Sequence, residues 1–211
     1  MAIDALILDY GGVVMHEDPV DYDPIGRTLG LADGELWRIV HGVPEYRPSR
    51  TGAIGAEAYE QAIEAHLCTL APRAAVASAV DSLRAYYAAQ APIRPVMRTL
   101  LESLAGRVLR ALLSNASRGS TARFEQRGLG AWFECIVCSG DAGVAKPEAD
   151  AFRLVATRLG VAPERCALVD DVEENVAAAR ALGMHALHYH HGRHAELVQA
   201  LAGWKLPVPD G

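Results

Sequence analysis

The sequence predicts an α/β protein, in which a parallel sheet forms the core and an α-helical cap domain is inserted after the first strand. Short apolar runs, of which Ala5–Leu8 is the first, alternate with helical segments over much of the chain. Residues 22–89 instead show helical periodicity and no convincing strand. We therefore expect the core from residues 1–14 and 92–211 and the cap from residues 15–91.

The composition limits the class of protein and its partners. The chain has 211 residues, about half of them apolar, a formal net charge of −6 and no long basic run. Nucleic acid and anionic membranes are therefore poor partners. No apolar segment approaches the roughly 18 residues that span a bilayer, and the acidic N-terminus lacks the basic region of a secretory signal. We expect a cytoplasmic monomer or homodimer.

The first strand is expected at Ala5–Leu8, and it ends on Asp9. Gly11 and Gly12 follow, and glycine allows a tight turn and a close approach to a bound group. An aspartate at the carboxyl end of a strand lies where open α/β sheets bind ligands, so Asp9 is a candidate nucleophile or metal ligand. The alternative is a carboxylate that caps a turn.

The cap begins with a polar, acidic linker over Met15–Asp23, which Pro19 interrupts. Tyr59, Ile63 and Leu67 recur at helical spacing in the longest part of this region. The segment Gly42–Gly55 is rich in proline, glycine and arginine and is expected as a loop. Helices are expected at residues 23–29, 33–40, 56–70 and 73–89.

From residue 92 the chain alternates helix and strand. Gly106, Gly160 and Gly183 are placed to end helices. Alternation of strands with helices of ten to fifteen residues predicts parallel βαβ units, and hence a Rossmann-like sheet. Strands are expected at residues 108–113, 135–139, 167–169 and 185–189, and helices at about 96–104, 121–126, 152–159, 172–182 and 193–201.

Polar side chains follow several of these strands. Because the carboxyl ends of parallel strands meet at one edge of the sheet, these side chains are expected to converge. Carboxylates and backbone carbonyls suit Mg²⁺, and a cation with lysine, hydroxyl and amide donors suits a phosphoryl group. A carboxylate beside them can attack phosphorus and form an aspartyl-phosphate. The side chains concerned are Asp9, Ser114, Asn115, Lys146, Asp170 and Asp171.

Two other patterns have a structural and a functional interpretation. Cys135 and Cys138 form a CxxC, but no second ligand pair at suitable spacing accompanies it. Core cysteines are favoured over a redox or metal site. The histidine-rich segment at residues 188–194 is expected as a polar loop before the last helix, with metal binding as the alternative.

Four segments resemble the motifs of the haloacid dehalogenase-like hydrolase superfamily. The resemblance covers essentially the whole chain and is to subfamily IA, in which a helical C1 cap follows the first strand. The third and fourth segments are long and specific, and the spacing between all four also matches. The segments are LILDYGGVV, LLSNAS, SGDAGVAKPEADAF and LVDDVEENVAAARALG.

The resemblance implies a role for each matching residue. Asp9 would be the nucleophile and a direct Mg²⁺ ligand, and the carbonyl of Gly11 a further ligand. Asp171 would bind the ion directly, and Asp170 either directly or through water.

The other motif residues would bind the phosphoryl group. Ser114 would donate a hydrogen bond to a phosphoryl oxygen, assisted by the backbone or side chain of Asn115. Lys146 would neutralise the nucleophile and the phosphoryl oxygens. Asn175 would hold the loop of the fourth motif in place.

One departure from the family pattern concerns position 11. Phosphatases of this superfamily usually carry a second aspartate two residues after the nucleophile, which protonates the leaving alcohol and then activates water. This chain has Gly11 there. General acid–base catalysis contributes roughly 10²–10⁴-fold, so phosphatase chemistry should be slowed. Similar members with glycine here are sugar-phosphate phosphatases, and His16 is a candidate replacement.

The cap is expected to determine specificity, because a lid that closes over a site excludes water and contacts the substrate. Arg47 and Arg50 lie in its central loop, where an arginine can bind a second anionic group. A solvated basic loop is the alternative. Gly11 and Gly12 are the expected substrate contacts on the core side.

The combined prediction is a Mg²⁺-dependent phosphomonoester hydrolase that acts on a small phosphometabolite, with sugar phosphates as one candidate class. The first rival is a 2-haloacid dehalogenase, which would use Asp9 without a metal and would not need Asp170 and Asp171. The second rival is a non-catalytic protein that binds a phosphorylated ligand. Gly11 favours that reading, and the retention of Asp9 and Lys146 opposes it.

Overall fold

Short apolar strands form one parallel sheet in the computed structural model, which describes residues 2–89, 92–190 and 192–208. Within this part of the chain the sheet has five strands in the order β3-β2-β1-β4-β5, so the first strand lies at the centre. The strands are β1 (Ala5–Leu8), β2 (Leu109–Ser114), β3 (Cys135–Cys138), β4 (Cys166–Asp170) and β5 (His185–His188).

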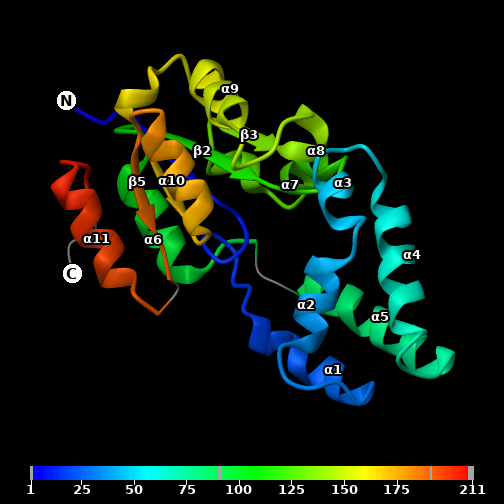
Figure 1. The fold of residues 1–211 in the computed structure, drawn as a ribbon. Coiled ribbons are helices and arrows are strands. Elements are labelled where there is room, and N and C mark those ends of the chain that lie inside the picture. The colour runs from blue at the N-terminus through cyan, green and yellow to red at the C-terminus, as the bar shows by residue number, and fades with distance from the viewer. Residues whose placement is uncertain (1, 90–91, 191, 209–211) are drawn as a thin grey trace.

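Successive side chains of a strand point to opposite sides of the sheet. Because consecutive residues of the central strands are apolar, both faces of the sheet are apolar. Leu6 and Leu8 pack with α6 (Pro95–Leu104), α7 (Ser120–Gln126) and α11 (His194–Gly203). Ala5 and Ile7 pack on the other face with α9 (Ala149–Leu159) and α10 (Glu173–Ala181). The result is a three-layer α/β core (Figure 1), which confirms the predicted fold class.

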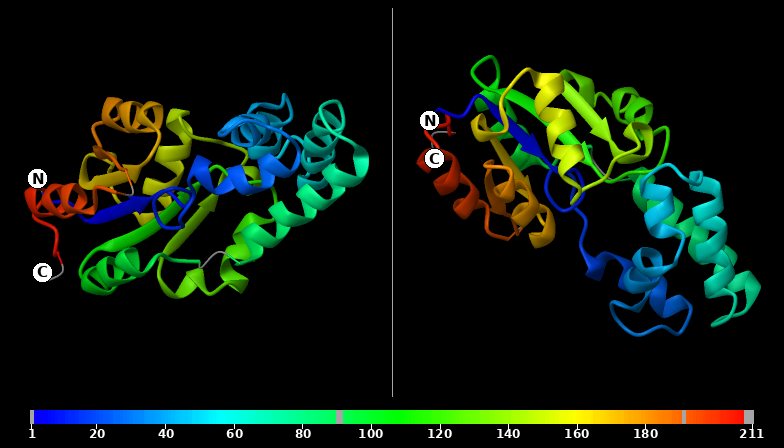
Figure 2. Two further views of the ribbon diagram at one scale, coloured as in Figure 1. Left: turned by 90° about the horizontal axis from the view of Figure 1, so that it is seen from below. Right: turned by 45° about the horizontal axis from the view of Figure 1, so that its top comes forward.

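The helices that follow β1 form a second unit beside the core, as Figures 1 and 2 show. They have their own apolar cluster, in which Tyr22, Leu36 and Leu67 are almost fully buried. The elements are η1 (Pro19–Tyr22), α1 (Asp23–Thr28), α2 (Glu35–Gly42), α3 (Tyr46–Arg50), α4 (Ala56–Leu67) and α5 (Arg73–Ala89).

Two chain segments connect this cap to the core, and they lie next to each other. The amide of Arg94 donates a hydrogen bond of 2.9 Å to the carbonyl of Val14. The boundaries expected at residues 1, 91 and 211 lie outside the described residues. Within the described ranges, no helix combines the length and the apolar character that a membrane crossing requires.

The structure corrects the sequence prediction for Gly42–Gly55. This segment is not a continuous loop, because it contains the short helix α3. Pro48 lies in the first turn of that helix, where proline's missing N–H costs no intrahelical hydrogen bond. Ser49 Oγ donates to the carbonyl of Tyr46 at 2.7 Å and supports the turn.

Several other boundaries differ from the prediction by one to three residues, among them the ends of α4 and β3. Helix α4 ends at Leu67 instead of residue 70, and the hydroxyl of Thr69 donates to the carbonyl of His66 at 2.7 Å. Such bonds compete with helix continuation. Ser139 belongs to the short helix α8 (Ser139–Ala142) instead of β3. The 3₁₀ turns η2 (Leu129–Ala131) and η3 (Pro163–Arg165) complete the core.

Candidate active site

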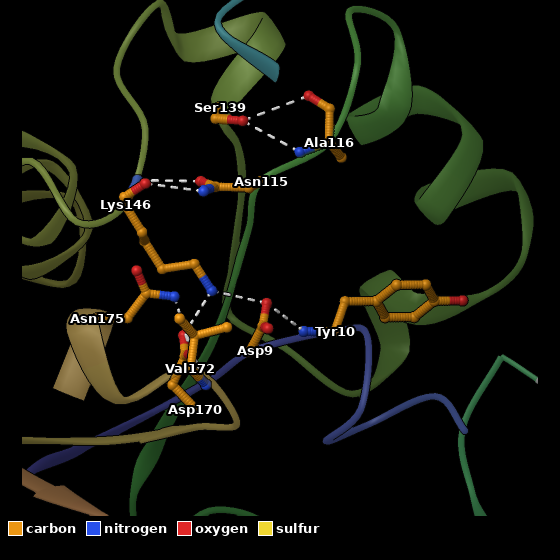
Figure 3. A network of polar contacts seen from close by, with 9 residues as sticks. All are labelled: Asp9, Tyr10, Asn115, Ala116, Ser139, Lys146, Asp170, Val172 and Asn175. Carbon is orange, nitrogen blue, oxygen red and sulfur yellow. Dashed lines mark hydrogen bonds and ion pairs between the residues drawn. The ribbon is translucent and has the colours of Figure 1, made fainter. Parts of the chain in front are cut away.

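The polar groups that follow the strands meet at one edge of the sheet, as the sequence predicted. Asp9 follows β1, Ser114 and Asp170 end β2 and β4, and Lys146 reaches the same place from the loop after α8. The Lys146 ammonium lies 2.7 Å from Asp9 Oδ1 and 2.6 Å from Asp170 Oδ2 (Figure 3). The lysine is buried, so these ion pairs are shielded from solvent.

Asp9, Asp170 and Asp171 each offer a carboxylate oxygen within 4.8 Å of the others. Burial, together with the neighbouring Asp170 and Asp171, raises the pKa of Asp9 well above its usual range, although Lys146 opposes the shift. Burial and Asp170 also raise the pKa of Asp171. Although burial opposes it, the pKa of Lys146 is raised because Asp170 and Asp9 stabilise the ammonium. An oxygen-only cluster with excess negative charge fits a hard divalent cation.

Asp170 is held more completely than the other two aspartates. Its Oδ1 accepts hydrogen bonds from Asn175 Nδ2 at 2.8 Å and from the amide of Val172 at 2.9 Å, and its Oδ2 contacts Lys146. Both of its oxygens therefore have protein partners. Asp171 faces the cavity instead, and its backbone carbonyl lies 2.9 Å from Nε2 of His188.

Asn115 positions the segment that carries Lys146. Its side-chain Nδ2 donates to the carbonyl of Lys146 at 2.8 Å, and its Oδ1 accepts from the Lys146 amide at 2.9 Å. Ser139 Oγ similarly accepts from the amide of Ala116 at 3.0 Å. The side chain of Asn115 is thus occupied, while Ser114 lines the cavity.

The two glycines after the nucleophile lie against different carboxylates. Gly12 has a φ of +71°, and a Cβ there would overlap Oδ2 of Asp171. Gly11 has no such backbone constraint, but a Cβ there would overlap Oε2 of Glu17. Gly11 lines the cavity, whereas Gly12 is absent from the lining formed by the described residues.

A cavity of about 760 Å³ lies between the core and the cap. On the core side Asp9, Ser114, Lys146 and Asp171 contribute to its lining, and we call this set, together with Asp170 that Lys146 contacts, the core wall. The opposite side is aromatic and aliphatic, with Val40, Ile63, Val80 and Leu83 among its aliphatic members. Its aromatic, histidine and arginine residues are called the cap wall below: Trp37, His41, Tyr46, Arg50, Tyr59 and Tyr87.

The two arginines predicted for substrate binding lie in different surroundings. Arg50 belongs to the cap wall, where its guanidinium carbon lies 4.7 Å and 5.0 Å from the ring centroids of Tyr46 and Tyr59. Its Nη1 donates to Ser117 Oγ at 2.9 Å. The Arg47 side chain is 80% exposed and lies 3.8 Å from Glu148. In the described part of the chain, Arg47 does not contribute to the cavity lining.

Glu17 lines the cavity, although it lies in the segment predicted as an acidic linker. Its Oε1 accepts hydrogen bonds from the hydroxyls of Tyr22 at 2.9 Å and Tyr87 at 3.4 Å, and lies 4.0 Å from Nε2 of His41. Burial raises the pKa of this carboxyl. The one signal in the sequence was an acidic residue shortly after a motif that lacks its usual second aspartate.

His16 and the CxxC lie apart from this site. His16 Nε2 lies 3.1 Å from Asp21 Oδ2, its side chain is 40% exposed, and it is absent from the described cavity lining. Cys138 is buried and Cys135 half-buried in β3, and both are free thiols. Among the described residues, the three-aspartate cluster is the one group with metal-ligand spacing.

Comparisons with known proteins relate the chain to one family. The profile of the haloacid dehalogenase-like hydrolases matches residues 3–183. Fructose-1-phosphate phosphatase YqaB of Escherichia coli is 24% identical over 186 residues, which cover 86% of this chain and 94% of the relative.

Solved structures resemble the whole fold. A HAD family enzyme of Bacteroides thetaiotaomicron, in complex with magnesium and inorganic phosphate, aligns with a TM-score of 0.66 at 20% identity and covers 91% of this chain and 96% of its own. An L-2-haloacid dehalogenase of Xanthobacter autotrophicus, with chloropropionic acid covalently bound, aligns with a TM-score of 0.64 at 20% identity. This alignment covers 99% of this chain and 90% of the dehalogenase. At these identities the likeness establishes the fold alone.

Proposed function

We propose, from the premise that the chain belongs to the haloacid dehalogenase-like hydrolases, that it is a Mg²⁺-dependent phosphomonoester hydrolase. It would act on a small phosphorylated metabolite through an aspartyl-phosphate at Asp9. The observation that carries this proposal is the buried cluster in which Lys146 contacts Asp9 and Asp170 while Asp171 lies beside them.

Asp9 is proposed as the nucleophile because it is oriented and accessible at once. Its Oδ1 accepts hydrogen bonds from the Tyr10 amide at 2.7 Å and from Lys146, so the carboxylate cannot rotate freely. The residue also lines the cavity. A fixed carboxylate in contact with the substrate is the arrangement that nucleophilic catalysis requires.

The charge of the cluster supports a divalent ion. Lys146 contacts Asp9 and Asp170, and Asp171 lies beside them, so one ammonium faces three carboxyl groups. Asp9, Asp171 and the carbonyl of Gly11 would hold the ion, and the full occupation of Asp170 by protein donors supports its binding through water. A bound Mg²⁺ would neutralise charge on the phosphoryl oxygens.

The phosphoryl group would lie between Ser114 and Lys146. The Ser114 hydroxyl and the Lys146 ammonium supply donors, while the Asn115 side chain fixes the backbone of Lys146. For Asn115 the structure therefore supports a contribution through its backbone. Similarity to a fructose-1-phosphate phosphatase supports sugar phosphates as the substrate class.

We propose residues 15–91 as the cap, and Arg50 as its contact with a second anionic group of the substrate. Arg50 Nε is buried and has no hydrogen-bond partner among the described residues, so its N–H can donate a hydrogen bond to a ligand oxygen. Gly12 would shape the loop beneath the substrate, and Arg47 would act at the rim. The cytoplasmic location and the monomeric or homodimeric state stay predictions.

The test is phosphate release from a panel of phosphomonoesters, including sugar 1- and 6-phosphates and an aryl phosphate. The wild type should require Mg²⁺, lose activity with a chelator, and become inactive as Asp9→Asn. Halide release from 2-haloacids without metal would instead establish the dehalogenase alternative. Silence in both assays, with retained binding of phosphate esters, would favour the non-catalytic alternative.

A further inference from the structure

The structure places a carboxylate where the sequence lacks one. A Cβ built on Gly11 would overlap Oε2 of Glu17, so the Glu17 carboxylate occupies the start of the path that a side chain at position 11 would take. Gly11 is not among the glycines with positive φ. Its backbone therefore admits other residues, and a side chain at position 11 would require the Glu17 carboxylate to move.

The chain reversal after β1 brings Glu17 to this position. The amide of Val14 donates to the Asp9 carbonyl at 3.3 Å and that of Met15 to the Tyr10 carbonyl at 2.8 Å. An isolated bridge then pairs Gly11 with Met15. The chain thus returns past the nucleophile, and residue 17 faces the same cavity as Asp9.

The Glu17 side chain is held in one orientation from the cap side. The Tyr22 hydroxyl donates to Oε1 at 2.9 Å. The Tyr87 hydroxyl lies within hydrogen-bonding distance of both Oε1 and the Tyr22 hydroxyl, so its single proton is shared between these two acceptors. With Oε1 fixed in this way, Oε2 is the oxygen turned toward Gly11. The carboxylate is therefore positioned beside the nucleophile loop by groups that take no part in the chemistry.

The other acidic groups of the cavity have different surroundings. In the described part of the chain the lining carboxylates are Asp9, Glu17, Glu60 and Asp171. Asp9 and Asp171 belong to the three-aspartate cluster, and Glu60 pairs with Arg84 at 2.6 Å. His41 also lines the cavity, but its Nδ1 is bonded to the Trp37 carbonyl at 2.9 Å. Glu17 is the carboxyl that lies beside Gly11.

We propose that Glu17 is the acid/base residue of the hydrolysis and replaces, from six positions further along the chain, the side chain that Gly11 lacks. This inference rests on the proposed function. The same position suits both half-reactions, because the leaving oxygen and the attacking water occupy the same side of the phosphorus in an in-line displacement at Asp9.

The two steps balance as follows. An Asp9 oxygen forms a bond to phosphorus, the ester P–O bond breaks, and the Glu17 carboxyl gives its proton to the leaving alcohol oxygen. Water then forms a bond to phosphorus and gives a proton to the Glu17 carboxylate, while the bond between phosphorus and Asp9 breaks. The products are the alcohol and inorganic phosphate, and both side chains return to their starting states.

The first experiment compares Glu17→Gln with the wild type on a sugar phosphate and on an aryl phosphate. Glutamine retains the acceptor for Tyr22 and Tyr87 but carries no transferable carboxyl proton. For the sugar phosphate we expect kcat to fall roughly 10²–10⁴-fold. The aryl alcohol leaves without protonation, so it should be released in a burst, followed by slow turnover of the phosphorylated enzyme.

Glu102→Gln is the matched control, because Glu102 is an exposed carboxylate of α6 that is absent from the described cavity lining. It should stay within a few-fold of the wild type on both esters. Equal losses on the two esters in Glu17→Gln, without a burst, would indicate a structural role and would overturn the inference.

A second variant restores the carboxylate from the other position. Glu17→Ala removes the group that overlaps a side chain at position 11, so Gly11→Asp combined with Glu17→Ala should recover at least tenfold over Glu17→Ala alone. Gly11→Asp by itself should be impaired, because Glu17 still occupies the space. A folded double variant without recovery would contradict the proposal.

The controls separate this inference from the proposed function. A wild type that releases no phosphate from any ester would overturn the proposed function and, with it, the role of Glu17. A wild type that needs Mg²⁺ and Asp9 but is indifferent to Glu17→Gln would overturn the inference alone.

Discussion

The core wall and the cap wall of the cavity are built from different kinds of interaction. The core wall carries charges at the ends of buried strands, and its ion pairs are 2.6–2.7 Å long. The cap wall carries aromatic rings from α2, α3, α4 and α5, and Arg50 contacts two of its tyrosines. Glu17 lies between them, next to Gly11 on one side and Tyr22 on the other.

We infer from this difference that the core wall carries out the chemical step and that the cap wall selects the substrate. Buried, mutually fixed charges stabilise charge that develops in a transition state, and they do so for any phosphate ester. Apolar and aromatic surface with a few polar groups instead recognises the remainder of a ligand. We therefore expect core-wall changes to affect kcat and stability, and cap-wall changes to affect KM and substrate choice.

The largest expected effect follows from Lys146→Met. The change leaves Asp9 and Asp170 buried without their cation, and breaking a buried ion pair in this way costs about 3–5 kcal/mol. Urea denaturation in the presence of a chelator should show this loss, and a separate assay with Mg²⁺ should show no turnover. The matched control is Lys205→Met, at the exposed lysine of the chain, which should change neither. An unchanged denaturation midpoint for Lys146→Met would contradict the importance of the pair.

The next effect concerns His41 of the cap wall. Burial, with a contribution from Arg50, lowers the pKa of His41 to about 4, although its bond to the Trp37 carbonyl opposes the shift. Glu17 also faces the ring at 4.0 Å, and the aromatic neighbours are Trp37 and Tyr46. The unfolded chain, with a histidine pKa near 6.5, binds the proton more readily, so stability falls as pH drops from 6.5 to 4.

His41→Phe should remove this part of the pH dependence, which amounts to about 3 kcal/mol at the acidic end of the window. The measurement is the free energy of unfolding as a function of pH for both proteins. Parallel curves between pH 6.5 and 4 would show that His41 is not a neutral buried residue of the cap wall.

The smallest effect distinguishes the two arginines of α3. Arg50→Ala removes a half-buried guanidinium whose Nε is buried, and a charge-assisted hydrogen bond contributes about 1.5–3 kcal/mol. We expect KM to rise roughly 10–100-fold for substrates with a second anionic group. Arg47→Ala, at an 80% exposed side chain, should leave KM within a few-fold. Equal effects of the two changes would remove the distinction between cavity and rim.

The core wall could be predicted from sequence because topology alone brings it together. Parallel strands end at one edge, so Asp9, Ser114 and Asp170 had to converge once the strands were recognised. The hydrogen-bond partners of these residues could not be predicted from the order of the strands. The assignment of the Asn115 side chain to the Lys146 backbone depends on the paths of two loops.

The cap wall was predicted only in part, because helix packing decides which residues face the cavity. Tyr59 was recognised as a member of the apolar face of a helix. Its position beside Arg50 depends on how α3 and α4 pack against each other. The role of Glu17 was not predicted, because Glu17 lies beside Gly11 only through the chain reversal after β1. Local composition gave it the character of an acidic linker.

The most direct test of the proposed chemistry is to trap the acyl-phosphate during turnover. Borohydride reduces an aspartyl-phosphate to homoserine, which peptide mass spectrometry can locate. With Mg²⁺ and a saturating phosphate ester, we expect homoserine at position 9 and at no other aspartate. An enzyme that releases phosphate steadily while Asp9 stays unmodified would contradict the covalent mechanism.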